Sequence, residues 1–171
     1  ATRLPFIYFV IHLDNHFHLD WWTIGLYVAC YQGARVVTSA VSITSPQLSH
    51  FIGTSAGLAG YITVFVSDKD SVAPFVIGTA IVGFSATMSS IQKYAKEMYK
   101  LDPNARFKLK FQYAFVMIGV VFAFSIGGFV YQYHKINGVA LFGIIIESLA
   151  LLALFAFWCV GADSNAEDAT T

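Results

Sequence analysis

One ionisable residue, Glu147, interrupts the long apolar run INGVALFGIIIESLALLALFAFWCV at positions 136–160. A helix rises about 1.5 Å per residue, so a run of this length is long enough to cross the hydrocarbon core of a bilayer. An unpaired charge at that depth costs at least ~2.5 kcal/mol. The sequence therefore predicts that Glu147 is paired with a cation, protonated, or in contact with water inside the membrane.

The composition favours an integral membrane protein over a soluble one. The chain is 57% hydrophobic and 12% charged, with a net charge of zero, whereas soluble domains carry about 25% charged residues. We therefore expect the lipid bilayer as its surroundings and no nucleic-acid partner. Phosphate-binding glycine loops and Ser/His/Asp spacings are not evident either, so we do not expect an enzyme.

The apolar runs predict an all-α membrane bundle. A spanning segment must satisfy its backbone internally, and these runs are continuous rather than alternating as in a barrel. We expect one transmembrane domain at 1–160 and a polar, disordered tail at 161–171. The domain should hold a partial span at 4–13 and five full spans at 21–43, 51–67, 72–92, 109–133 and 137–160.

The basic link 93–110 predicts the orientation of these spans. It carries five lysines and one arginine against only Glu97 and Asp102, and an excess of Lys and Arg marks the inner side of a membrane. The loops 14–20, 68–71 and 134–136 should then lie together on the outer side.

Small residues predict which helices lie deep in the bundle. Counting the partial span as the first, glycines recur in the third, fourth and fifth spans, at 51–67, 72–92 and 109–133. Small residues allow helices in lipid to approach closely. We therefore expect these three helices to be central. The glycines are Gly53, Gly57, Gly60, Gly78, Gly83, Gly119, Gly127 and Gly128.

Arg35 and Glu147 are the two charges predicted to lie within spans, and Gln32 lies one turn before Arg35. One interpretation is structural: Arg35 pairs with Glu147 or extends its head towards the inner headgroups. The other is functional: Glu147 carries a proton, and Arg35 holds an anionic group or gates access. A pigment or metal ligand at Glu147 is a third option.

The segment HLDNHFHLD places His12, His16 and His18 at even positions, alternating with Asp14 and Asp20 in the same register. These side chains are candidate metal ligands. The spacing would put them on one side of an extended segment but on scattered sides of a helix. A polar outer loop is the alternative interpretation.

Several stretches resemble the major facilitator superfamily. DWWTIGLYVACYQGARVVTSAV is similar to its second helix, FVIGTAIVGFSATMSSIQKYAKEMY and the basic link after it to its fourth, and FAFSIGGFVY to its fifth. The region SIQKYAKEMY is most similar to the branch related to UNC-93 proteins. The resemblance implies the N-terminal half of a transporter that moves a small solute, with proton coupling as an option. It also implies a partner: a second half, a second copy, or a larger membrane complex.

A rival hypothesis belongs to another class. The link TSPQLSH contains neither the Asp nor the Arg residues that the family often has between its second and third helices. The alternative is a non-transporting accessory subunit of a photosynthetic or respiratory supercomplex. In a photosynthetic complex, chlorophyll or carotenoid would be its cofactors.

Overall fold

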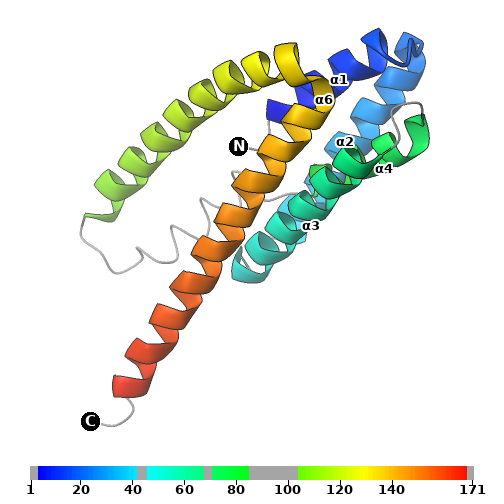
Figure 1. Cartoon of the computed structure of the whole chain (residues 1–171). Coiled ribbons are helices and arrows are strands. Elements are labelled where there is room, and N and C mark those ends of the chain that lie inside the picture. Colours follow the sequence, from blue (N-terminus) through cyan, green and yellow to red (C-terminus); the bar gives the residue numbers. More distant parts are fainter. Residues whose placement is uncertain (1–3, 42–45, 68–70, 85–103, 169–171) are drawn as a thin grey trace.

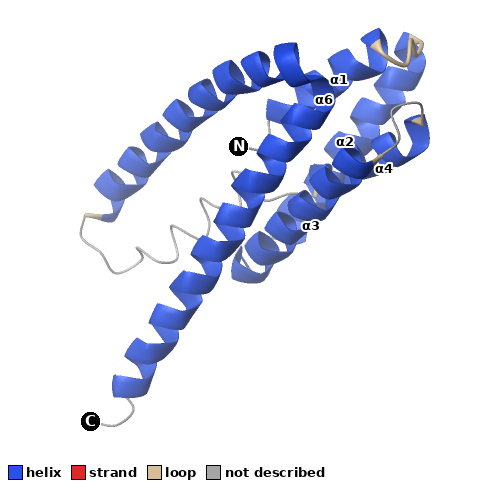
Figure 2. Cartoon of the chain, viewed as in Figure 1, coloured by secondary structure: helices blue, strands red, loops and turns tan. Residues whose placement is uncertain are grey.

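The computed structural model describes residues 4–41, 46–67, 71–84 and 104–168, and these are helical apart from short connections (Figures 1 and 2). The predicted all-α class is confirmed for this part of the chain. The helices are α1 (Leu4–Asn15), α2 (Trp21–Val41), α3 (Pro46–Val66), α4 (Val72–Gly83) and α6 (Ala105–Asp168).

Helix α6 is broken at Lys135, whose backbone has φ 54° and ψ −148°. A positive φ is unusual for a residue with a side chain, and it ends one helical segment and starts another. We call 105–134 the arm and 136–168 the stem. The break falls within the predicted loop 134–136. Figure 1 shows the arm, in green to yellow, leaving the bundle, while the stem, in orange to red, runs along α3.

Helices α3 and α4 pack closely through glycines, as the sequence predicted. A Cβ added at Gly60 would lie 2.6 Å from the Val82 nitrogen, so any larger residue would force the backbones apart. A Cβ at Gly83 would lie 2.8 Å from the Tyr31 carbonyl oxygen of α2. The third and fourth predicted spans are therefore central.

The prediction that the fifth span is also central is wrong. Ile118, Val121 and Phe122 on the arm are exposed, and nothing lies within 4 Å of a Cβ added at Gly119. The arm meets the bundle near its C-terminal end. There the Tyr8 hydroxyl donates to the Phe124 carbonyl at 2.9 Å, and the Tyr8 and Tyr131 rings stack at 5.4 Å.

Five full transmembrane helices are not supported. Within the described ranges, one helical stretch, Phe124–Ala156, is long and apolar enough to cross a membrane, and it includes the break at Lys135. Helix α2 contains Gln32 and Arg35, and both lower its hydrophobicity. The apolar part of α3 is short, and α4 ends at Gly83, so both are apolar helices of less than spanning length. The rest of the predicted span 72–92 lies outside the described residues.

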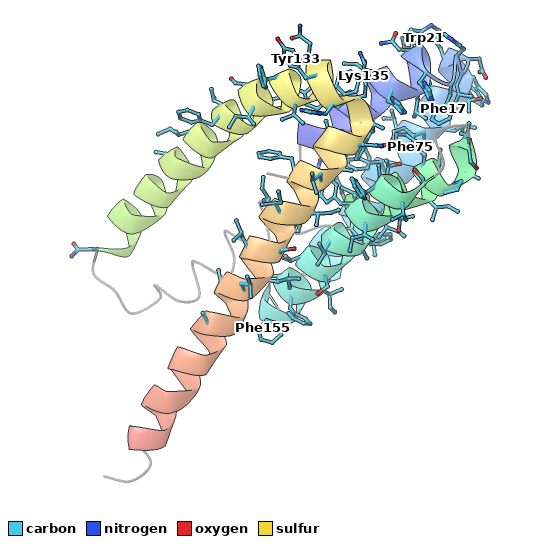
Figure 3. All side chains as sticks on the ribbon, in the orientation of Figure 1. Phe17, Trp21, Phe75, Tyr133, Lys135 and Phe155 are labelled. Carbon is cyan, nitrogen blue, oxygen red and sulfur yellow. The ribbon has the colours of Figure 1, made fainter. Side chains whose placement is uncertain are left out.

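Large apolar side chains cover much of the outer surface. Trp21 and Trp22 at the start of α2 are 74% and 76% exposed, which fits the interfacial position expected for tryptophan (Figure 3). The division into a domain at 1–160 and a tail at 161–171 stays a prediction, although the helical backbone of α6 continues to Asp168.

Candidate functional site

Glu147 lies on the stem and faces α3 rather than the outside. Only 7% of the residue is exposed. Gly143 lies one turn earlier on the same face, and its missing side chain leaves room for the Tyr61 ring of α3. The Glu147 carboxylate also acts electrostatically on the Tyr61 phenol. The helix–helix contact therefore positions an acidic group inside the bundle.

Three tyrosines occupy the interior of the bundle, and one of them, Tyr61, is next to Glu147. Tyr27 and Tyr31 come from α2 and Tyr61 from α3, and all three are buried. The Phe6 ring of α1 lies 4.8 Å from the Tyr31 ring. The Tyr27 hydroxyl is buried near Thr79 but does not reach hydrogen-bonding geometry. The interior of the bundle is thus aromatic, with hydroxyl groups placed among the rings.

Arg35 lies beside Tyr31 of this cluster. It follows Tyr31 by one turn of α2, is half-buried, and acts electrostatically on the Tyr31 phenol. Gln32 is exposed. Both Arg35 and Glu147 are described, and no ion pair joins them. Arg35 instead acts electrostatically on Tyr31, and Glu147 acts on Tyr61.

The three candidate histidines do not form one group. Helix α1 continues to Asn15, so His12 and His16 follow helical rather than extended spacing, and their rings stack at 4.7 Å. His18 lies in the following loop with φ 50° and is exposed. Across the described ranges, no cluster of three or more His, Cys, Asp or Glu residues could hold a metal ion.

His12 and His16 instead line a cavity of about 360 Å³ at one end of the bundle. Lys135, at the break in α6, also lines it, as do Phe17 and Phe75, and Figure 3 shows these three labelled residues close to one another. The predicted outer loops 14–20 and 134–136 thus meet here. We call this cavity the basic pocket. Its remaining lining residues are Asn15, Ser67, Tyr131, His134, Ile136 and Asn137.

The basic pocket takes its positive charge from residues other than His12. Burial, together with the nearby charge of His16, lowers the pKa of His12 from 6.5 to about 4. His12 is therefore a neutral hydrogen-bonding group at pH 7. The positive charge comes from Lys135, an exposed lysine at the break in α6.

A second hollow, about 390 Å³ in volume, lies beside the basic pocket. It shares His134 and Asn137 with that pocket, but most of its lining is apolar. We call it the apolar groove. Its other lining residues are Phe65, Val130, Gly138, Leu141, Phe142 and Ile145.

Sequence reasoning missed both hollows. His134 and Lys135 lie in the predicted loop 134–136 and Asn137 begins the predicted span 137–160, and none of the three was predicted to be a site residue. The sequence did contain one signal for these hollows: the polar loops 14–20, 68–71 and 134–136 were predicted to lie together on the outer side of the membrane. No family model matches the chain, and neither curated proteins nor solved structures provide a match. The resemblance to the major facilitator superfamily therefore stays a prediction.

Proposed function

We propose that this chain is a transporter-like integral membrane protein that moves a small solute, with Glu147 as its proton carrier. One observation carries the proposal: a buried carboxylate faces the bundle interior from a helix that is otherwise apolar. Within the helical stretch Phe124–Ala156, only 22% of the apolar 18-residue segment that could cross a membrane is buried against the rest of the protein. The core helix of a soluble protein would be mostly buried, so this surface is better suited to lipid or to another membrane segment.

The stem has an exposed apolar surface that another membrane component would have to cover. Its exposed apolar residues recur every three or four positions and therefore form one stripe along the helix. Lipid, a second transporter half or a second copy of the chain would cover that stripe. The residues are Leu141, Ile145, Leu149, Leu152 and Phe155.

Arg35 has a complementary role in this proposal. A half-buried guanidinium next to an aromatic interior can present two parallel donors to an anionic solute. Glu147 and Arg35 would then act on the proton and the solute separately, since they lie on different helices and form no ion pair with each other.

The test is flux into proteoliposomes that contain the full chain. A pH gradient should drive uptake of at least one member of a labelled panel of amino acids, sugars and monocarboxylates. Glu147→Gln should abolish the pH-driven part because an amide cannot release a proton at neutral pH. Glu147→Asp retains the carboxyl group and is the matched control. Flux that Glu147→Gln leaves unchanged would contradict the role of Glu147 as proton carrier.

The accessory-subunit hypothesis is favoured by a different observation, the exposed arm. Phe122, Ile126 and Phe129 are large, apolar and exposed on it. A helix of this kind suits permanent contact with other membrane subunits. Purification in mild detergent distinguishes the two functions. A subunit should stay in one large complex, with the absorption of chlorophyll or carotenoid if that complex is photosynthetic, whereas a transporter should separate alone or as a small oligomer.

A further inference from the structure

The basic pocket and the apolar groove meet at the break in α6, and together they match the two ends of an amphiphile. We propose that they bind the carboxylate and the alkyl chain of a single-chain fatty acid. This site is distinct from Glu147 and Arg35, so the proposal goes beyond transport and does not depend on it.

The carboxylate end follows from the groups that line the basic pocket. The described lining residues include one lysine and three histidines but neither Asp nor Glu: Lys135, His12, His16 and His134. Asn15 and Asn137 add neutral hydrogen-bond donors. Charge-assisted bonds from Lys135, supported by such donors, are the interactions that a carboxylate accepts most strongly.

The alkyl end follows from the groove. Val130 and Leu141 come from the arm and the stem, and Phe65 comes from the end of α3. These side chains can contact a hydrocarbon chain but offer it no hydrogen bonds. Because His134 and Asn137 border both hollows, a chain in the groove would hold its carboxylate at the basic pocket. The single groove favours one alkyl chain over the two of a phospholipid.

The backbone at Lys135 explains why the two hollows are adjacent. Its φ of 54° bends α6, so the arm and the stem diverge from this residue. If α6 were straight, the arm and the stem would be collinear, and no hollow could form between them beside His134 and Asn137. Strained backbone of this kind persists where the surrounding structure fixes it, which is common at ligand sites.

A photoreactive fatty acid tests the proposal on the full chain in non-ionic detergent. A diazirine near the methyl end should label peptides that contain 138–145. Laurate should compete for this labelling at least about tenfold better than dodecanol, which has the same chain length and no charge. Acetate, which has the charge without the chain, should not compete at millimolar concentration.

Substitutions at Lys135 test whether its ammonium group binds the carboxylate of the fatty acid. Lys135→Gln should weaken laurate competition by about tenfold, and Lys135→Arg should preserve it. Lys108→Gln is a matched control, because position 108 lies roughly 40 Å away along the arm. The comparison of laurate with dodecanol on the unmodified chain needs no variant, so it stands even if Lys135→Gln does not fold.

Three results would overturn the proposal. Equal competition by laurate and dodecanol would exclude recognition of the carboxylate. Labelling spread evenly over the exposed stripe of the stem would show general partitioning onto apolar surface. Stronger competition by phosphatidic acid than by laurate would assign the site to a phospholipid instead. Loss of flux in Glu147→Gln with laurate binding retained would separate this site from the proposed function.

Discussion

Individual residues decide how closely the helices of this bundle approach each other. Gly60 is the clearest case, since α4 backbone atoms occupy the space that any side chain there would need. Gly33, in the middle of α2, has nothing within 4 Å of an added Cβ. The two glycines therefore differ in contact although both lie inside helices, and the difference gives a matched experiment.

We expect Gly60→Ala to destabilise the fold by about 1–3 kcal/mol, because the new methyl group would push α3 away from α4. Gly33→Ala should instead stabilise it by about 0.5–1 kcal/mol, since alanine favours the helix and meets no neighbour. Chemical unfolding of both variants in detergent, followed by circular dichroism, measures the two changes. Equal effects of the two substitutions would contradict the contact described for Gly60.

His12 makes a second prediction at this scale. Its pKa in the folded chain is about 4, below its ordinary value of 6.5, so protonation favours the unfolded state. The stability that neutral His12 contributes is complete above pH 6.5 and is lost as the pH falls through about 4. Thermal melts between these values should show a decline, which His12→Gln reduces and which His18→Gln, at an exposed loop position, leaves unchanged. A decline of the same size in all three proteins would refute the assignment.

At the scale of elements, the sequence predicted where helices occur better than how many cross a membrane. The apolar runs predicted α1, α2, the arm and the start of the stem close to their observed bounds, because length and hydrophobicity are local properties, whereas the stem continues to Asp168, beyond the predicted end at 160. The break at Lys135 was also placed correctly, since polar residues interrupt the apolar run there. Helix α2 is long enough to span a membrane but not apolar enough, because Gln32 and Arg35 lower its hydrophobicity.

The start of α2 offers a test at this scale. The Thr23 amide donates to one Asp20 carboxylate oxygen at 3.0 Å, and the Thr23 hydroxyl donates to the other at 2.6 Å. Asp20 therefore caps the helix, and these hydrogen bonds lower the pKa of its carboxyl group. Asp20→Ala should lower the melting temperature, and Asp20→Ser should restore most of the loss because serine also caps.

The same hydrogen bonds fix the sign of the pH dependence. A carboxyl group whose pKa is lowered by folding contributes stability above its unfolded pKa, and this stability is lost as the pH falls through the folded pKa. The difference in melting temperature between the unmodified chain and Asp20→Ala should therefore shrink in acid. A difference that does not change with pH would show that the cap acts without its charge.

At the scale of the whole molecule, the site was predictable only in part. Glu147 was recognised as buried because a charge inside an apolar run is visible in the sequence. Its neighbour Tyr61 was not, since the contact depends on Gly143 opening one face of the stem to α3. The basic pocket was missed because His12 and Lys135 lie far apart in the sequence. Contacts between distant segments are set by packing geometry, which local patterns do not encode.

The proposed membrane orientation can be tested with two single cysteines. Cys30 and Cys159 are first replaced by serine, and His18→Cys and Asn104→Cys are then made separately at exposed positions. An impermeant maleimide applied to intact vesicles should label one of the two sites, because they lie at opposite ends of the arm and the bundle. Both sites should react once detergent is added. Labelling of both on sealed vesicles would contradict the topology.

The attachment of the arm has a mechanical consequence. Tyr8 holds it at Phe124, in its C-terminal half, while Ile118 and Val121 further towards residue 105 remain exposed. A stiff rod fastened close to one end behaves as a lever. A small tilt of α1 at Tyr8 would therefore sweep the distant tip at Ala105 through a much larger arc.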